Sequence, residues 1–277
     1  MRIGEIEVTP LIDGVWRFPV PALYDKAEDD WAAHAAFFED GMVVNQLGAF
    51  LVRTADRTVL IDAGNGPSDD PSQGRLLHEL ARAGVAPDEV TDVVLTHLHF
   101  DHVGWVSDGE RPTFPRATYR CDEADWRFFT GPDPCDESTA LALLGGLPAR
   151  VRLAPIEAQL TTWSGDASLL PGLDVRAAPG HTPGSALVVL SSGAARALVL
   201  GDVVHCPLEL LEADWHYLHD VDPALARRTR AQVAAELEGD RDLAAASHFP
   251  GLRFGRLVRA GGARRWSFAD DRPPGPT

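Results

Sequence analysis

The sequence predicts an α/β protein built from two similar β-rich halves, and three observations support this prediction. Short runs of aliphatic and β-branched residues, typical of strands, alternate with segments whose apolar residues recur at helical spacing. A hairpin followed by a carboxylate occurs in each half, so the second half repeats the pattern of the first. The chain has 277 residues, of which 45% are hydrophobic, so it can bury a substantial core.

Residues 47–64, LGAFLVRTADRTVLIDAG, are predicted to form the first hairpin. AFLV and TVLI are its strands, the polar TADR is its turn, and Asp62 follows the second strand. Residues 72–84, SQGRLLHELARAG, have apolar residues at helical spacing, and Gly84 is typical of a helix stop. Residues 90–95, VTDVVL, are typical of a buried strand.

Residues 185–202, SALVVLSSGAARALVLGD, are predicted to form the second hairpin, in which Asp202 occupies the place of Asp62. Between the hairpins, residues 131–150 are rich in proline and glycine. We interpret them as a connecting region rather than a domain boundary, because motif residues on both sides belong to one site.

The clearest helical pattern is DPALARRTRAQVAAELEGD, residues 222–240. Asp222 is predicted as its N-cap, Pro223 as its first helical residue, and Gly239 as a residue beyond its end. We therefore expect a single domain over residues 1–270 and a disordered tail at 271–277.

Charge and cysteine content limit the classes of partner. The chain has 41 acidic and 25 basic residues, and its net charge of -16 disfavours nucleic acids and anionic membranes, which require a basic face. Neither a signal peptide nor a membrane-spanning apolar segment is recognisable. The 3 cysteines form no CxxC pair and are typical of reduced thiols. We expect a cytoplasmic protein that acts on a small molecule.

The stretch THLHFDHVGW, residues 96–105, directly follows the predicted strand at 90–95. In open α/β sheets, ligands bind at the carboxyl ends of strands. His97 and His99 alternate along an extended segment, and Asp101 and His102 come after the chain turns. One loop can thus present two pairs of ligands in different directions, which suits two metal ions better than one.

Three further short motifs supply more candidate ligands, namely His181 in APGHTPGS, Asp202 in GDVVH and His248 in ASHFPG. Each motif alone is a weak signal, because a histidine can be a hydrogen-bonded core residue and an aspartate can cap the next segment. Together with the loop at 96–105, they form a set that is large enough for two ions.

The motifs THLHFDH, PGHTPGS, GDVV and SHFPG, in this order and at these intervals, resemble the metallo-β-lactamase-fold hydrolases from residue 47 to beyond residue 248. The resemblance implies a four-layer αββα sandwich with the metals at one edge of the paired sheets. It implies one metal bound by His97, His99 and His181, a second bound by Asp101, His102 and His248, and Asp202 as a ligand of both. Asp62 then either holds a ligand in place or is a plain turn residue.

This ligand set implies a binuclear metal-dependent hydrolase. Two divalent ions about 3.5 to 4 Å apart can share a water and lower its pKa toward about 7, so the expected nucleophile is a bridging hydroxide. Asp101 would orient it and pass its proton to the leaving group. The ligand types favour zinc, while iron, manganese, cobalt and nickel also accept them. The di-iron redox branch of the family typically has glutamate in the position of His99, which favours hydrolysis here.

The expected substrate is small and partly apolar, with a lactone, aryl ester or phosphotriester bond. Trp105 and Phe249 follow ligands and are predicted to line the pocket. Residues 15–46 contain Trp31 and Phe37, and this segment either covers the site as a lid or packs against the sandwich. Its apolar residues are also compatible with a homodimer contact.

The residue after GDVV bears on the branch of the family. Acyl-homoserine lactone lactonases usually carry a tyrosine three residues after the bridging aspartate, and His205 occupies this position here. GDVVH and the segment after His248 look closer to the methyl parathion hydrolase branch. His205 either donates to the scissile oxygen or packs beside Asp202.

Two other functions stay open. A glyoxalase-II-like thioesterase needs basic residues for an anionic thiol carrier, and Arg253, Arg256 and Arg259 either serve this role or form a solvated face. A mono-iron oxidoreductase or dioxygenase on the same fold would lose part of the second ligand set, which is complete in this sequence.

Overall fold

Two seven-stranded mixed sheets dominate the computed structural model, which describes residues 1–240 and 242–269. The predicted tail at 271–277 lies outside the described residues. The first sheet has the order β1-β2-β3-β4-β5-β6-β7. Its strands are β1 (Arg2–Ile3), β2 (Ile6–Pro19), β3 (Met42–Arg53), β4 (Thr58–Ile61), β5 (Asp92–Val94), β6 (Thr118–Asp122) and β7 (Leu160–Trp163).

The second sheet has the order β14-β13-β12-β11-β10-β9-β8. Its strands are β8 (Ala167–Leu170), β9 (Leu173–Ala177), β10 (Ala186–Ser192), β11 (Ala195–Val199), β12 (Leu243–Ala245), β13 (Gly255–Ala260) and β14 (Ala263–Phe268). Both predicted hairpins are confirmed, because β3 pairs antiparallel with β4 and β10 pairs antiparallel with β11.

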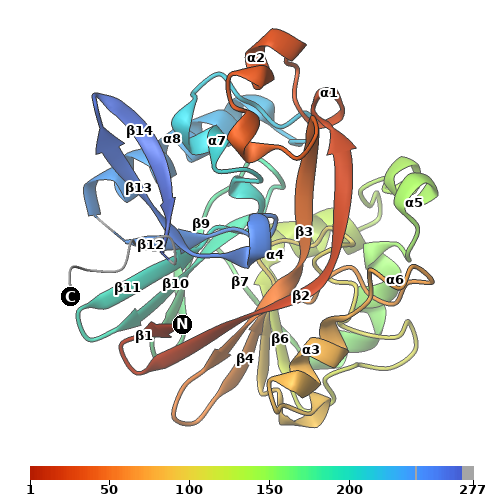
Figure 1. The fold of residues 1–277 in the computed structure, drawn as a ribbon. Coiled ribbons are helices and arrows are strands. Elements are labelled where there is room, and N and C mark those ends of the chain that lie inside the picture. The colour runs from red at the N-terminus through yellow and green to blue at the C-terminus, as the bar shows by residue number, and fades with distance from the viewer. Residues whose placement is uncertain (241, 270–277) are drawn as a thin grey trace.

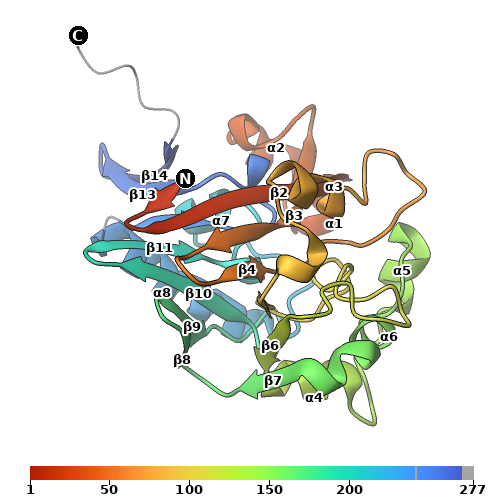
Figure 2. The ribbon, with the colours of Figure 1, turned by 90° about the horizontal axis from the view of Figure 1, so that it is seen from below.

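Helices cover the outer faces of the two sheets, which completes the expected four layers (Figures 1 and 2). The α-helices are α1 (Val20–Leu23), α2 (Glu28–Ala32), α3 (Leu76–Arg82), α4 (Glu123–Thr130), α5 (Ser138–Leu144), α6 (Ala149–Leu153), α7 (Leu208–Leu211) and α8 (Pro223–Asp240). The 3-10 helices are η1 (Ala35–Phe37), η2 (Pro87–Glu89), η3 (Ala154–Gln159), η4 (Gly201–Val203) and η5 (Pro250–Leu252). Helices α3, α4 and α6 pack on the first sheet, and α7 and α8 pack on the second.

Three apolar clusters hold these layers together. The middle cluster lies between the sheets and joins Phe50 and Ile61 of the first sheet to Val188 and Val199 of the second. The outer clusters join each sheet to its helices, as Leu80 of α3 does for the first. Each strand in the middle of a sheet is therefore buried on both faces, which explains its continuous aliphatic sequence.

The helix predicted at 72–84 is shorter than expected, because a side chain of strand β2 determines where it begins. Asp13 of β2 accepts a hydrogen bond of 2.7 Å from the backbone N–H of Leu76, so α3 begins there. Gly84 follows the helix at a φ of +73°, as the predicted stop requires.

The predicted connecting region at 131–150 contains α5 and the start of α6, and apolar residues of α5 such as Leu144 pack against Trp16 and Phe100. One further prediction differs from the structure. Helix α8 starts at Pro223 with Asp222 as its cap, but it runs to Asp240, so Gly239 lies inside it rather than beyond its end. A glycine in a last turn costs only about 1 kcal/mol relative to alanine, which the helix tolerates.

Within residues 1–240 and 242–269, no helix combines the length and the apolar character needed to cross a lipid bilayer.

Candidate metal centre

The predicted ligands come together at one edge of the paired sheets. Strands β4 and β5 are parallel, as are β11 and β12, so each pair ends at the same edge. His97 follows β5, Asp202 follows β11 and His248 follows β12, while His181 lies in the loop between β9 and β10. The order of strands therefore gathers residues that are far apart in the sequence.

The ligands form two groups that a shared carboxylate connects. Within each group, the ligand atoms lie within 4.8 Å of one another: His97, His99 and His181 in the first group, and Asp101, His102 and His248 in the second. Asp202 is within the same distance of His97 and His102, one residue from each group. This is the division that the sequence motifs implied.

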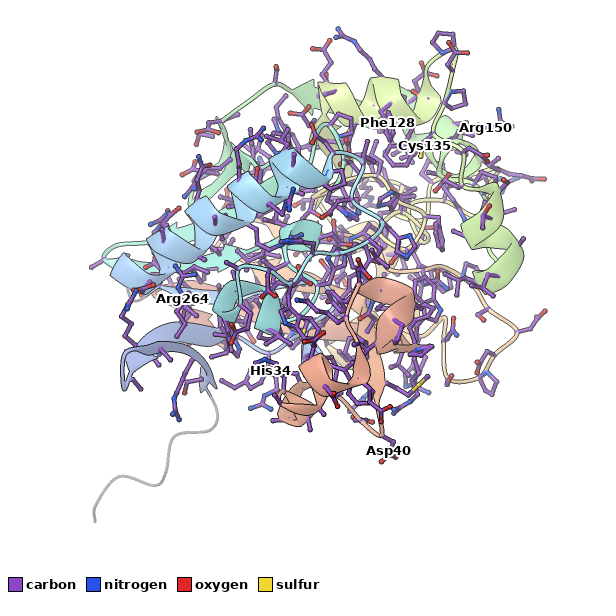
Figure 3. The ribbon with its side chains drawn as sticks, turned by 90° about the horizontal axis from the view of Figure 1, so that it is seen from above. His34, Asp40, Phe128, Cys135, Arg150 and Arg264 are labelled. Carbon is purple, nitrogen blue, oxygen red and sulfur yellow. The ribbon has the colours of Figure 1, made fainter. Side chains whose placement is uncertain are left out.

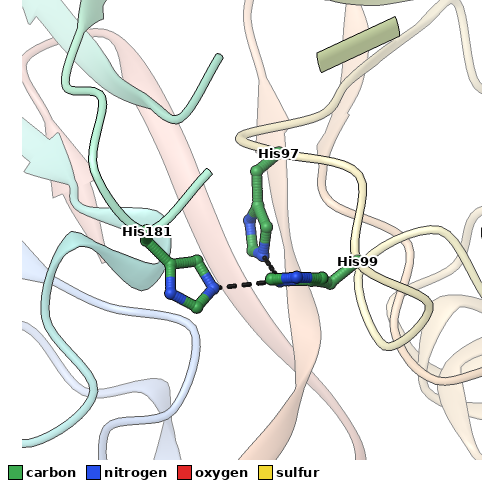
Figure 4. Close-up of side chains that lie close together, drawn as sticks. All are labelled: His97, His99 and His181. Atoms are coloured by element: carbon green, nitrogen blue, oxygen red, sulfur yellow. Dashed lines mark hydrogen bonds between the residues drawn. The ribbon is translucent and has the colours of Figure 1, made fainter. Parts of the chain in front are cut away.

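The first group offers three imidazole nitrogens that can act as metal ligands. Figure 4 shows its three imidazole rings pointing toward one another, with Nδ1 of His99 3.0 Å from Nε2 of His97 and 2.9 Å from Nε2 of His181. One ring nitrogen has a single hydrogen or a single lone pair in the ring plane, so it can pair with only one of these neighbours. A cation between the rings would satisfy all three nitrogens, so the group fits a metal.

The second group shows the same unsatisfied character. Nε2 of His102 and Oδ1 of Asp202 lie 3.3 Å apart. Both atoms are buried, and neither has a hydrogen-bond partner among the described residues. Buried polar atoms without partners are costly, and a cation bound by both would remove the cost.

Residues behind the ligands form hydrogen bonds with the ligand rings and orient them. Nδ1 of His102 lies 2.9 Å from Oδ2 of Asp62, and Nδ1 of His248 lies 2.8 Å from the carbonyl oxygen of Gln46. These contacts hold Nδ1 of both rings, and Nε2 faces Asp202 at 3.3 Å in His102 and at 3.0 Å in His248. Asp62 also accepts hydrogen bonds from Thr96 and Ser247, so it is more than a turn residue.

The pKa shifts of His97, His99 and Asp202 suit metal binding. Burial and the neighbouring imidazoles hold the pKa values of His97 and His99 well below their usual range, so both rings keep free lone pairs. Burial alone would raise the pKa of Asp202, but the surrounding histidines hold it well below its usual value. Asp202 therefore stays ionised while it is buried. Burial would lower the pKa of His102, but the carboxylates of Asp202, Asp101 and Asp62 hold it well above its usual value, so a metal ion would displace a proton from this ring.

His205 lies beneath the surface of the site rather than in contact with its open space. Its Nε2 is 3.2 Å from Oδ2 of Asp202, and its ring stacks on Tyr217 with centroids 3.5 Å apart. Tyr217 lines the cavity above the ligands, whereas His205 does not. Of the two roles considered, the geometry favours packing beside Asp202, where His205 is also a candidate ligand with His181 and Asp202.

A cavity of about 410 Å³ opens onto the ligands. His99, Asp101, Asp202 and His248 form part of its polar wall. The lining also includes the apolar residues Trp16, Phe18, Leu23, Phe100, Ala140 and Leu144. Such a cavity holds a small molecule with an apolar part and directs its polar part toward the ligands.

The structure corrects the predicted pocket residues next to the ligands. The indole N–H of Trp105 donates to Oδ1 of Asp13 at 3.0 Å, and Phe249 is fully buried against Trp266. Neither lines the cavity, because the chain turns after each ligand and directs the next aromatic ring into the core.

The N-terminal segment contributes to the cavity with other residues than predicted. Trp16, Phe18 and Leu23 line the cavity. Trp31 and Phe37 belong instead to a separate apolar cluster around Trp215. His34 and Asp40, labelled in Figure 3, mark this outer part of the segment at the edge of the molecule. Residues 16–23 thus form a wall of the site, and the following helices pack beside it.

A buried ionic network behind the site has no motif in the sequence. Nδ1 of His181 lies 3.2 Å from Oδ1 of Asp220. Arg230 of α8 connects Asp220, at 3.2 Å, to Glu209, at 2.9 Å. Glu209 accepts a further hydrogen bond of 2.7 Å from the hydroxyl of Tyr24. These charged residues are separated in the sequence and form no motif, so the network could be recognised only once the structure showed that they are buried together.

Gly104 is required where the ligand loop crosses the loop after β4. A Cβ at Gly104 would lie 1.9 Å from the backbone carbon of Asn65. We expect Gly104→Ala to lower the free energy of unfolding by about 3 kcal/mol, the upper part of the range for overpacking, as measured by urea denaturation. Gly84→Ala, where a Cβ meets nothing within 4 Å, should cost only about 1 kcal/mol of backbone strain. An unchanged midpoint for Gly104→Ala would contradict the predicted clash.

The family model that describes the metallo-beta-lactamase superfamily matches residues 48–248. The chain belongs to the metallo-beta-lactamase superfamily. Members of this family depend on metals, and the matched range includes every ligand of the two groups.

Two curated relatives are similar in sequence to parts of the chain. N-acyl homoserine lactonase AiiB of Agrobacterium fabrum (strain C58 / ATCC 33970) is 33% identical over 78 residues, which cover 22% of this chain and 28% of that protein. Metallo-beta-lactamase domain-containing protein 1 of Homo sapiens is 32% identical over 187 residues, 67% of this chain and 57% of that protein. The matches thus span from about a quarter to just over half of these relatives' lengths.

Solved structures of metallo-beta-lactamase type match almost the whole chain. The hydrolase AbOPH superposes with a TM-score of 0.84 at 26% identity, over 96% of this chain and 95% of that chain. The dizinc quorum-quenching lactonase AidC also has a TM-score of 0.84, at 23% identity and with 96% and 95% coverage. The likeness to AidC establishes the fold alone.

Proposed function

We propose that the protein is a binuclear metal-dependent hydrolase that cleaves an ester-type bond in a small, partly apolar substrate. A lactone, an aryl ester and a phosphotriester are the substrate types that fit. The observation that carries the proposal is the position of Asp202 between two ligand groups, in the lining of a largely apolar cavity. The hydrolase AbOPH, which shares this fold, supports the same class of reaction.

The residues of the chain have distinct parts in this reaction. Two divalent ions in the two groups, zinc by ligand type, would polarise the scissile bond and lower the pKa of a water molecule. Asp101 lines the cavity, and its Oδ2 lies 3.6 Å from Nε2 of His248. From there it can orient the attacking water and pass a proton to the leaving oxygen. Trp16 and Phe100 would hold the apolar part of the substrate and exclude bulk water.

The charge of the cavity favours an ester over the thioester of an anionic carrier. No lysine or arginine is among the described residues that line the cavity. Arg259 pairs with Glu238 and Arg253 lies over the ring of Phe268, both outside the cavity lining. A carrier with carboxylates would need cations that this wall lacks, which speaks against a glyoxalase-II-like thioesterase.

The completeness of the second group favours two ions over a single iron. Asp101, His102 and His248 lie together with their ligand atoms in reach of one ion. A mono-iron oxidoreductase or dioxygenase would have no use for this group.

A substrate panel tests the proposal. Purified protein with bound zinc is assayed on a lactone, an aryl ester, a phosphotriester and a thioester of similar size. We expect cleavage of at least one of the first three, loss of activity after chelation and its recovery with zinc. Asp101→Asn should lower kcat by about 10²- to 10⁴-fold, as expected for loss of a general acid–base group.

The matched control is Asp56→Asn in the exposed turn between β3 and β4, which should keep full activity. Cleavage of the thioester alone, or full activity of the chelated protein, would contradict the proposal.

A further inference from the structure

Asp125 of α4 is a completely buried carboxylate that connects the two loops of the first ligand group. Its Oδ2 accepts hydrogen bonds from the backbone N–H of Leu98, at 3.1 Å, and from the hydroxyl of Thr182, at 2.9 Å. Its Oδ1 accepts the backbone N–H of Gly184 at 2.6 Å. The donors come from the loops at 96–105 and 178–185, which are otherwise far apart in the sequence.

The positions of these donors relate Asp125 to the ligands themselves. Leu98 lies between His97 and His99, and Thr182 directly follows His181. One turn further along α4, Phe129 contacts the ring of His99 edge-on, with centroids 5.3 Å apart. The distance between His99 and His181 therefore depends on how α4 holds the two loops.

The second ligand group has a different anchor. Asp62 accepts a hydrogen bond from Ser247, the neighbour of His248, and its Oδ2 contacts Nδ1 of His102. Asp125 contacts neither of these ligands. Asp62 also accepts two hydrogen bonds from Thr96, the neighbour of His97, whereas Asp125 contacts only the loops of the first group, so a change at Asp125 tests the first site.

We propose that Asp125 is a positioning residue that sets the metal affinity of the first group independently of the second. The inference rests on the proposed function in so far as both groups bind a metal ion. Asn at this position has nearly the same volume as Asp, but its NH2 group would face one of the N–H donors that the carboxylate now accepts. One loop would lose its anchor, while the ligands themselves stay intact.

The experiment measures metal binding to the whole protein without substrate. Metal-free wild type and Asp125→Asn are titrated with Co²⁺, and absorption spectra and equilibrium dialysis report the two sites. His181→Ala and His248→Ala supply reference spectra for loss of the first and second group. We expect two bound ions in wild type and a 10- to 100-fold weaker first site in Asp125→Asn, the usual cost of losing an outer partner. The second site should keep its affinity.

Asp92→Asn is the matched control, because Asp92 is equally buried in the first sheet but pairs with Arg57 and Arg120 outside the site. It should leave both metal affinities unchanged even if the protein becomes less stable. Thr182→Val removes one of the three hydrogen bonds to Asp125, together with the contact between the Thr182 and Ser185 hydroxyls. It should weaken the first site by a smaller factor, which gives a second measurement if Asp125→Asn folds poorly.

Equal weakening of both sites, or unchanged affinity in both Asp125→Asn and Thr182→Val, would overturn the inference. Failure of the proposed function has a different signature. A wild type that binds two ions but cleaves none of the esters would contradict the function and leave the role of Asp125 standing.

Discussion

Asp202→Asn is expected to reduce ester hydrolysis on the order of 10³-fold and to lower the number of bound metal ions below two. The reason is that one carboxylate serves both ligand groups. Its Oδ2 lies 3.0 Å from Nε2 of His248 and 3.6 Å from Nε2 of His181, and its Oδ1 lies 3.3 Å from Nε2 of His102. Metal ions supply several kcal/mol of transition-state stabilisation, and each 1.36 kcal/mol corresponds to about tenfold in rate.

The asparagine variant separates charge from shape. Asparagine keeps the volume of the side chain but removes the negative charge that balances the buried histidines around it. The measurements are kcat on the best ester of the panel and zinc content by elemental analysis after dialysis. Asp69→Asn, at an exposed loop position, is the control and should match wild type in both. Full zinc content with unchanged kcat in Asp202→Asn would contradict a shared ligand.

The ligands could be predicted because each follows a strand in a short motif. His97 and Asp202 come directly after aliphatic runs, and the parallel pairing of β4 with β5 and of β11 with β12 brings the ends of these strands together. Strand order is therefore enough to gather them, whatever the details of side-chain packing. The hairpins were predictable for the same reason, since pairing between neighbouring strands depends on local sequence.

The cavity wall could not be predicted in this way. Trp16, Phe100 and Leu144 meet there from three distant segments, and only the packed tertiary structure brings them together. The aromatic residues that stand next to ligands in the sequence, Trp105 and Phe249, point into the core instead. Proximity in sequence to a ligand is thus a poor guide to contact with substrate, because the chain turns at each ligand and directs the following aromatic side chain away from the cavity.

Arg230→Met is expected to lower the free energy of unfolding by roughly 3 to 5 kcal/mol, the range for breaking a buried ion pair by removing one partner. Arg230 is 4% exposed and is the cation between Glu209 and Asp220. Burial alone would raise the pKa of Glu209, but Arg230 and His205 hold it below its usual value, so the carboxylate is ionised. Methionine fills a similar volume and leaves two buried carboxylates without their counter-ion.

The effect should extend to the metal centre, because Asp220 contacts both Arg230 and Nδ1 of His181. Urea denaturation measures the stability, and zinc dialysis measures the affinity of the folded variant. Arg228→Met, at an exposed position of the same helix, changes the same residue type and should cost less than about 0.5 kcal/mol. Arg230→Lys keeps a charge but cannot reach both carboxylates with one planar group, so its free energy of unfolding should lie between those of Arg230→Met and Arg228→Met. If Arg230→Met and Arg228→Met were equally stable, the network would add nothing to the fold, and His181 would need another source of its orientation.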